Sequence, residues 1–204
     1  MEIKKEEKIE KIIYELLCLL GEDVNREGLK KTPKRVAKAW KELLTPYEFN
    51  HSTFNANGHS QMIIVKNINY YTFCEHHLLP FFGKVSIGYI PDKKIIGISK
   101  LPRTVEFYSK RLNTQEYFTD NIAKNLQNNL NPLGVGVLVT GRHLCQEMRG
   151  VKKTGETITS CLLGRFLNES DVRKEFYKMY LKYGEKKKQS LAQKNFLSFV
   201  KHMW

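Results

Sequence analysis

Two short clusters of thiols and imidazoles are the residues of this chain whose types and spacing could do chemistry. The first is the run "CEHH", in which Cys74 and His77 stand three apart, so that one turn could aim both at a single ion. The second is His143 and Cys145, two apart at the end of an apolar run, so both would project from one face of a strand. Zinc prefers such nitrogen and sulfur ligands, and a catalytic zinc site uses three of them and keeps a position for water.

Together the clusters offer two thiols and three imidazoles, the imidazoles coming from His76, His77 and His143. Three ligands from this set would leave two histidines for proton transfer, which suits the near-neutral pKa of imidazole. The first cluster alone could instead be a buried thiol beside a surface histidine, whereas an apolar strand face that ends in His143 and Cys145 is unusual for a core. The other two cysteines, Cys18 among leucines and Cys161 in a predicted strand, are predicted to be core thiols.

Basic residues accompany the clusters. Lys100 and Arg103 follow Ser99 at a predicted strand-to-helix junction, where the amides of a helix N-terminus also favour anions. Arg149 lies in "MRGVKK" and Arg35 lies in "TPKR". Each of them alone could be an ordinary surface charge. Near a metal site they jointly predict a cradle for phosphate groups.

The composition indicates a globular protein rather than a membrane or low-complexity chain. Of 204 residues, 41% are hydrophobic, which suits one domain with helical extensions. The formal charge of +13 attracts polyanions, and six lysines against one glutamate after residue 180 predict a solvated tail. No apolar run approaches the ~18 residues that span a bilayer, and the start of the chain resembles no signal peptide. Four cysteines are too few for a disulfide scaffold, so we expect a cytoplasmic protein.

Hydrophobic periodicity predicts the elements that would position these residues. Helices are predicted over residues 5–20, 100–112, 114–130, 170–183 and 190–203, and from "TPKR" to Pro46 with Thr32 as N-cap. Strands are predicted over residues 61–73, 83–91, 95–99, 134–145 and 156–166, and a loop over 47–60. Strand pairs flanking two helices predict an α+β fold, an antiparallel sheet with helices on one face. Its edge strands could pair with another subunit in a ring-like oligomer.

Longer segments resemble a known family, GTP cyclohydrolase I. They are "CEHHLLPFFGKVSIGYIP", "ISKLPRTVEFYSKRLNTQE", "GRHLCQEMRGVKK" with "TITS", and "REGLKKTPKRVAKAW", so the resemblance runs from about residue 9 to about residue 180. It implies the tunnelling fold (T-fold), with sheets joined into pentameric barrels, two pentamers stacked into a homodecamer, and active sites between subunits. The chain would then comprise a helical segment 1–60, a T-fold catalytic domain 61–183 and a basic helical extension 184–204.

The resemblance also implies roles for single residues, carried over by motif position. The zinc (Zn²⁺) ligands would be Cys74, His77 and Cys145. The residues that move protons would be His76, His143 and Ser99. The guanine would be held by Glu116, with Gln115 beside it. The ribose and triphosphate would be held by Ser99, Lys100, Arg103 and Arg149, with Arg35 joining from an adjacent subunit.

The implied reaction converts GTP and water to 7,8-dihydroneopterin triphosphate and formate, the first step of pterin and folate biosynthesis. Zinc would activate the water that attacks C8 of the purine while His143 protonates N7. His76 and Ser99 would serve the later ring opening, rearrangement and closure. Three features depart from the family pattern, and none touches a proposed ligand: the short connection "KKTGETITS", the arginine of "GRF", and the tail 184–204.

Three other interpretations stay open. A relative on the same fold, such as a pterin synthase, would do different chemistry, but the complete ligand set argues against it. A zinc-stabilised nucleic-acid-binding protein would suit the charge, but the chain has no finger spacing or RNA-binding signature, so we expect no nucleic-acid partner. The last helix could lie on a membrane through Phe196, Phe199, Val200 and Met203, although we expect it to pack on protein. The sequence leaves open the downstream pathway, zinc against iron, and feedback regulation.

Overall fold

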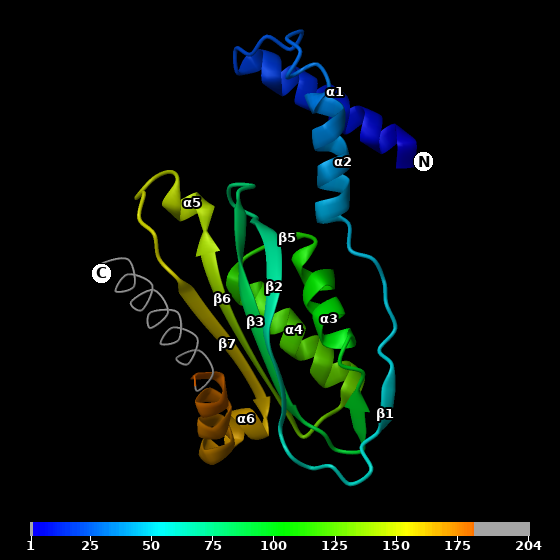
Figure 1. Cartoon of the computed structure of the whole chain (residues 1–204), viewed down its shortest axis with the longest axis vertical. Coiled ribbons are helices and arrows are strands. Elements are labelled where there is room, and N and C mark those ends of the chain that lie inside the picture. The colour runs from blue at the N-terminus through cyan, green and yellow to red at the C-terminus, as the bar shows by residue number, and fades with distance from the viewer. Residues whose placement is uncertain (1, 182–204) are drawn as a thin grey trace, which may run out of the picture.

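The β-rich centre of the chain forms a sheet that makes up the lower body of the view, below a pair of helices near the N-terminus (Figure 1). This computed structural model describes residues 2–181. The predicted helix 190–203 and the extension 184–204 lie outside the described residues.

Five strands form the main sheet in the order β5-β2-β3-β6-β7. They are β2 (Ile63–Cys74), β3 (Pro80–Ile90), β5 (Leu112–Asn113), β6 (Gly134–His143) and β7 (Thr157–Gly164). Neighbours among β2, β3, β6 and β7 are antiparallel, whereas the short β5, which the sequence analysis missed, pairs parallel with β2. The mixed α+β architecture is therefore confirmed.

Two helices cover one face of this sheet, α3 (Lys100–Ser109) and α4 (Gln115–Leu130). Because side chains alternate across a strand, every second residue of β3 and β6 points into the core beneath them. Val85, Ile87, Val137 and Val139 are fully buried there, against Ile122 of α4 among others. The predicted apolar stripe of α4 is buried along its whole length.

The opposite face is covered at one end by the C-terminal part of the described chain. The helix α6 (Arg165–Asn168) and the helical residues 170–181 place Phe166 and Phe176 on the sheet, in a second apolar cluster with Leu138. A side chain at Gly136 would approach Phe166 to 2.6 Å, so a glycine is needed at this strand position. The expectation of helices on one face only was therefore wrong, because the strand glycines leave room for aromatic rings on the other.

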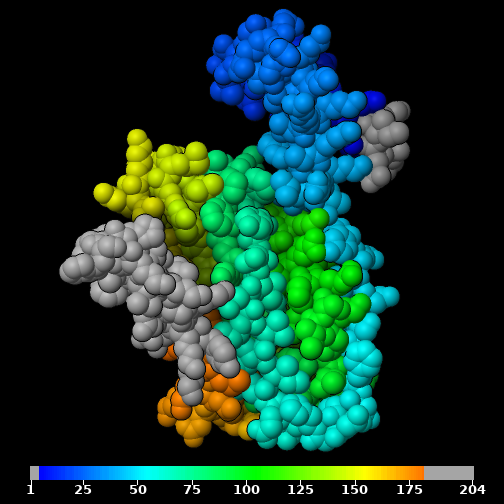
Figure 2. All heavy atoms as spheres, in the orientation of Figure 1, coloured from blue at the N-terminus to red at the C-terminus, as the bar shows by residue number. Residues whose placement is uncertain are grey.

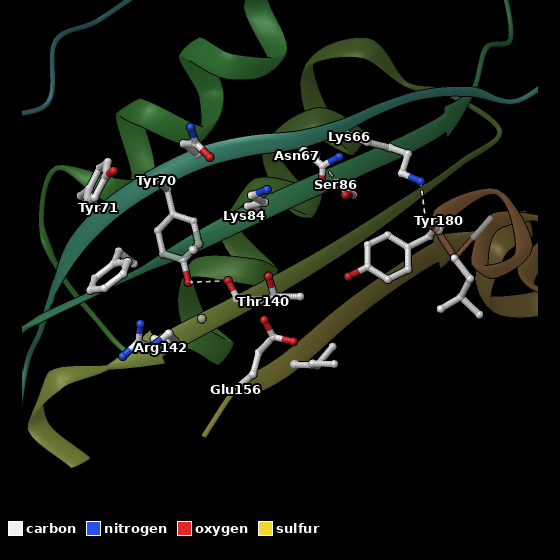
Figure 3. Close-up of a pocket in the computed structure, with 16 residues that line it drawn as sticks. Lys66, Asn67, Tyr70, Tyr71, Lys84, Ser86, Thr140, Arg142, Glu156 and Tyr180 are labelled. Carbon is white, nitrogen blue, oxygen red and sulfur yellow. Dashed lines mark hydrogen bonds between the residues drawn. The ribbon is translucent and has the colours of Figure 1, made fainter. Parts of the chain in front are cut away.

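On the rest of that second face, the described residues form a groove of about 680 Å³ (Figure 3). It is lined by side chains such as Lys66, Lys84 and Arg142. Two of these cations are already engaged. Lys66 Nζ donates to the carbonyl of Met179 at 2.7 Å, and Arg142 pairs with Glu147. Because Arg142 precedes His143 in β6, one end of the groove lies beside the sheet end that carries His143.

The N-terminal helices α1 (Glu2–Leu19) and α2 (Thr32–Leu44) pack against each other and project from the sheet (Figures 1 and 2). They are tied to the rest by the end of α2, where Lys110 Nζ donates to the carbonyl of Glu42 at 3.1 Å. Apolar side chains of α1 remain exposed, Leu19 by 85%. Cys18 is exposed as well, so the prediction that it is a core thiol was wrong within a single copy of the chain.

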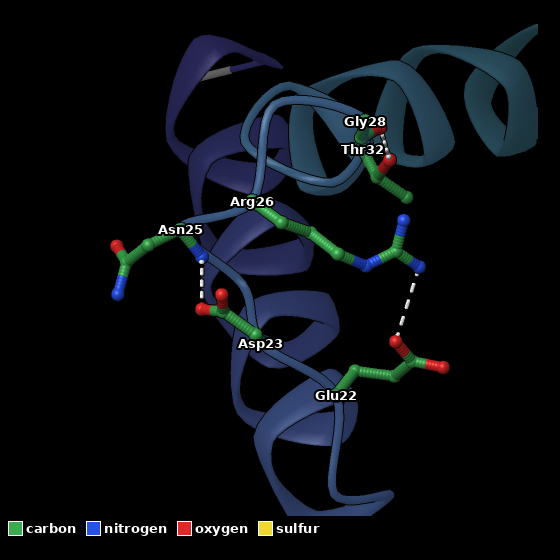
Figure 4. Close-up of polar contacts among 6 residues, drawn as sticks. All are labelled: Glu22, Asp23, Asn25, Arg26, Gly28 and Thr32. Carbon is green, nitrogen blue, oxygen red and sulfur yellow. Dashed lines mark hydrogen bonds and ion pairs between the residues drawn. The ribbon is translucent and has the colours of Figure 1, made fainter.

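The turn between α1 and α2 is held by short-range polar contacts (Figure 4). Arg26 pairs with Glu22 at 3.1 Å, and Asp23 accepts a hydrogen bond from the backbone of Asn25. Thr32 is the first residue of α2 rather than its N-cap, and its hydroxyl donates to the carbonyl of Gly28 at 3.3 Å. The predicted capping role was therefore wrong by one position.

Two further segments differ from expectation. The predicted loop 47–60 contains a short strand, β1 (Thr53–Asn55), which pairs antiparallel with β4 (Lys94–Ile96). The predicted strand 134–145 ends at His143, and Cys145 lies in a short helix, α5 (Leu144–Glu147). In the part of the chain that the structure describes, no helix is both long and apolar enough to cross a bilayer.

Gly136→Ala tests the packing of the C-terminal residues on the sheet. The added methyl group would collide with Phe166, and overpacking of this kind costs about 1–3 kcal/mol. We expect a lower midpoint of thermal unfolding. Gly97→Ala is the matched control, because its methyl group would meet only ordinary contacts at 3.6 Å. Equal midpoints for Gly136→Ala and wild type would contradict this packing.

Candidate metal centre

The turn between β2 and β3 carries the first predicted ligands. Cys74 is the last residue of β2, and the turn closes through Leu78 N, which donates to the carbonyl of Cys74 at 2.9 Å. Leu78 has a positive φ of 53°, which tightens the reversal. As a result His76 Nδ1 and His77 Nδ1 lie 3.7 and 3.8 Å from Cys74 Sγ.

The end of β6 brings the second cluster to the same place. Phe81 at the start of β3 pairs with His143, the last residue of β6, and α5 follows at once. The ligand atoms of Cys74, His77 and Cys145 then lie within 4.8 Å of one another. Two sulfurs and one imidazole nitrogen are a donor set that zinc prefers. Cys74 is buried, Cys145 half-buried and His77 exposed, so the residues present fit a zinc ion that water can reach.

Protonation of the thiols opposes metal binding in this cluster. Burial, and next the nearby Cys74, raise the pKa of the Cys145 thiol, while the positive charge of Arg149 acts in the opposite direction. A metal ion binds thiolates and therefore releases protons on binding. Arg149 is exposed and lies close enough to favour the thiolate form.

His143 is held on two sides. Its ring stacks on Phe81, with centroids 4.6 Å apart and planes 9° apart. Its Nε2 lies 2.8 Å from Oε1 of Gln115, a side chain that is only 2% exposed. Gln115 Nε2 donates to the carbonyls of Val139 and Thr157, so the amide oxygen must face His143. His143 therefore donates from Nε2, and its Nδ1 is the nitrogen left to titrate.

The position of Gln115 depends on a glycine. A side chain at Gly141 would collide with Gln115 Oε1 and lie 2.6 Å from the Tyr70 hydroxyl oxygen. Tyr70 is buried and donates to the carbonyl of Thr140. The sequence analysis missed Phe81, Tyr70 and Gly141 as parts of the site. Gly141 could have been found from the sequence, because it is a glycine inside a predicted strand, two residues before a candidate histidine.

Two more of the predicted residues, Glu116 and His76, lie at this end of the sheet. Burial lowers the pKa of His143, and the carboxylates of Glu116 and Glu147 partly oppose that shift. Glu116 is exposed in the first turn of α4, next to the buried Gln115. His76 is also exposed, with its Nε2 3.8 Å from a carboxylate oxygen of Glu75.

Arg149 lies beside this cluster, but the other predicted phosphate-binding residues do not join it within one chain. The backbone N–H of Ile96, three residues before Ser99, donates to the hydroxyl of Tyr89 near the far end of β3. Tyr89 stands eight residues after Phe81, which is about 26 Å along a strand. Ser99, Lys100 and Arg103 therefore begin α3 toward the opposite end of the sheet (Figure 1). Arg35 is exposed on α2, in the projecting helical pair.

Comparisons with known proteins agree on one family. The model of the family described as GTP cyclohydrolase I matches residues 9–181. GTP cyclohydrolase 1 of Aquifex aeolicus is 49% identical over 175 residues, covering 85% of this chain and 95% of that protein. The Campylobacter concisus enzyme of the same name is 45% identical over 181 residues, again covering 85% and 95%.

A solved structure titled as archaeosine synthase QueF-Like in the apo form is also similar. It is 19% identical, with a TM-score of 0.37, and the match covers 48% of this chain and 91% of that chain. A likeness at this level bears on neither fold nor function.

Cys145→Ser tests the ligand cluster directly. Loss of one of two sulfurs should strip most of the zinc from the purified protein, because thiolates supply much of the affinity. Cys161→Ser is the matched control. Cys161 is half-buried in β7, and burial raises the pKa of its thiol to about 11. Elemental analysis should give about one zinc per chain in the control. A zinc content unaffected by Cys145→Ser would exclude this cluster as the metal site.

Proposed function

Because this chain belongs to the GTP cyclohydrolase I family, we propose that it converts GTP and water to 7,8-dihydroneopterin triphosphate and formate with zinc held by Cys74, His77 and Cys145. This reaction is the first step of pterin and folate biosynthesis. One observation carries the proposal: the three ligand atoms lie within 4.8 Å of one another in a chain whose residues 9–181 match the family.

The residues around the cluster have separate tasks in this proposal. When bound, zinc supplies the Lewis acidity that makes water a nucleophile at neutral pH. His143 delivers a proton to N7 of the purine from Nδ1, since its Nε2–H is engaged by Gln115. Glu116 accepts hydrogen bonds from the guanine N–H groups, and His76 and Ser99 move protons in the later steps. Gln115 acts through His143, because its side chain is buried behind that ring.

A triphosphate needs more cations than one chain places beside the cluster. Of the four predicted basic substrate-binding residues, Arg149 lies there, whereas Lys100 and Arg103 start α3 toward the far end of the sheet. We therefore assign Ser99, Lys100 and Arg103 of each site to a neighbouring copy, with Arg35 contributed by another. Such a site requires a homo-oligomer, and the family resemblance supports a decamer built as a dimer of pentamers.

Features of the single chain support this assembly. Among residues 2–181, no strand pairs with the outer edges of β5 and β7 in the main sheet, and pairing with another subunit is one way to satisfy them. The exposed apolar residues of α1, including Ile12 and Leu19, would gain cover in an oligomer. All four cysteines are free, which suits the reducing cytoplasm where we place the enzyme.

The direct test is anaerobic incubation of the purified protein with GTP and zinc, followed by assays of formate and of the oxidised, fluorescent neopterin product. We expect both products in equal amounts. Formate without pterin would mean that hydrolysis proceeds and ring closure fails. Neither product from a metal-loaded oligomer would overturn the proposed function.

His143→Ala separates proton transfer from metal binding in the same assay. Removing a positioned acid typically costs about 10²–10⁴-fold, so pterin formation should fall by that factor. Zinc content should stay as in wild type, because His143 is not among the three clustered ligands. Loss of zinc from this variant would identify His143 as a ligand and contradict the assignment.

Sharing of sites between subunits can be tested by mixing two inactive variants, Arg103→Ala and His143→Ala. If the two residues of a site come from different chains, random co-assembly leaves one half times one half, about a quarter, of the sites intact. Co-expressed oligomers should therefore recover about a quarter of wild-type turnover, while each variant alone stays inactive. No recovery in mixed oligomers, verified by two affinity tags, would place both residues of a site in one chain.

A further inference from the structure

The metal ligand Cys145 sits in a helix that has little to hold it in place. α5 has four residues, none of them buried, and it ends with a backbone hydrogen bond from Met148 N to the carbonyl of Leu144 at 3.0 Å. A single turn of helix is not stable by itself. The position of the Cys145 sulfur therefore depends on contacts between α5 and the end of the sheet.

The strongest of these contacts is a bidentate ion pair, the fork between Arg142, the second-last residue of β6, and Glu147, the last residue of α5. Arg142 Nε donates to one carboxylate oxygen of Glu147 at 3.0 Å, and Arg142 Nη2 donates to the other at 2.5 Å. The side chain of Glu147 is only 9% exposed, while that of Arg142 is 52% exposed. Two parallel charge-assisted hydrogen bonds fix orientation as well as distance. Within the described residues, this is the only ion pair that α5 makes.

Arg142 is itself fixed to the sheet. It is the register partner of Phe82, and its guanidinium lies 5.8 Å from the centroid of the Phe82 ring. That ring stacks in turn with Tyr71 of β2, with centroids 5.9 Å apart. This row of side chains lies on the groove face, where Figure 3 shows Arg142 at the groove's edge. It therefore crosses β2, β3 and β6 on the face opposite Phe81 and His143.

We propose that Arg142 and Glu147 are positioning residues for the metal ligand Cys145, a role that rests on the proposed function. The fork joins the residue three before Cys145 to the residue two after it, and so holds the intervening turn closed. The sulfur then stays within reach of Cys74 and His77 before any metal arrives. Because the ion pair already orders α5, metal binding does not have to do so, and the affinity of the site for zinc is higher.

The test measures zinc affinity by competition with a chromophoric chelator, on the full chain and without GTP. Contacts that orient metal ligands typically contribute 10–100-fold to affinity, so Arg142→Ala should weaken zinc binding by about that factor. Arg142→Lys keeps the charge but cannot form the fork, and should fall between wild type and Arg142→Ala. The exchange Arg142→Glu with Glu147→Arg should recover most of the affinity. Excess zinc should restore GTP turnover to Arg142→Ala.

The chain offers a matched control in a second fork, between Arg165 and Glu169, with distances of 2.7 and 2.8 Å. It lies at the end of β7 that holds α6, so Arg165→Ala should leave zinc affinity unchanged. Arg142→Ala that binds zinc as tightly as wild type would overturn the proposal, and so would an equal loss in Arg165→Ala. If wild type binds zinc but does not turn over GTP, the positioning role stands on the affinities and the proposed function falls.

Discussion

The pairing of β3 with the strands on both sides of it is the constraint on which the rest of the structure depends. The tight turn from Cys74 to Leu79 sets β2 against β3, and the pair Phe81–His143 sets β3 against β6. Together they bring residues almost seventy positions apart to one end of the sheet. A slip of one residue in the β3–β6 register would exchange the faces of Arg142 and His143. His143 would then lose Phe81 and Gln115, and Arg142 would lose Phe82.

The two faces of this sheet end hold the two parts of the site in different ways. On the core face, His143 is fixed by ring stacking and by a buried amide whose other hydrogen bonds leave one tautomer. On the groove face, Arg142 reaches around to α5 and fixes the helix that carries Cys145. The proposed proton transfer and metal binding therefore depend on neighbouring residues of one strand, His143 and Arg142, but on separate sets of contacts. Two of the cations proposed for a triphosphate, Lys100 and Arg103, lie toward the other end of the sheet, and this is the physical reason for proposing an assembly of several copies.

Much of the fold could be predicted from the sequence, because the strand alternation of β3 and β6 and the apolar stripe of α4 are strong periodic signals. Contact between "CEHH" and "RHLC" could be expected from ligand chemistry, and the cluster of Cys74, His77 and Cys145 confirms it. The short helix α5 could not be predicted, since the alternation of "GVGVLVTGRH" gives no sign that it stops two residues before Cys145. Gln115 was expected at the substrate. Gln115 is buried because Gly141 has no side chain to occupy the same space, and the sequence does not show that these two residues meet.

X-ray absorption at the zinc edge of the purified, metal-loaded protein would test the central claim most directly. Ligation by Cys74, Cys145 and His77 predicts two sulfur neighbours at about 2.3 Å, with nitrogen and oxygen neighbours at about 2.0–2.1 Å. A first shell made only of nitrogen and oxygen, or containing a single sulfur, would contradict a metal centre built from these three residues.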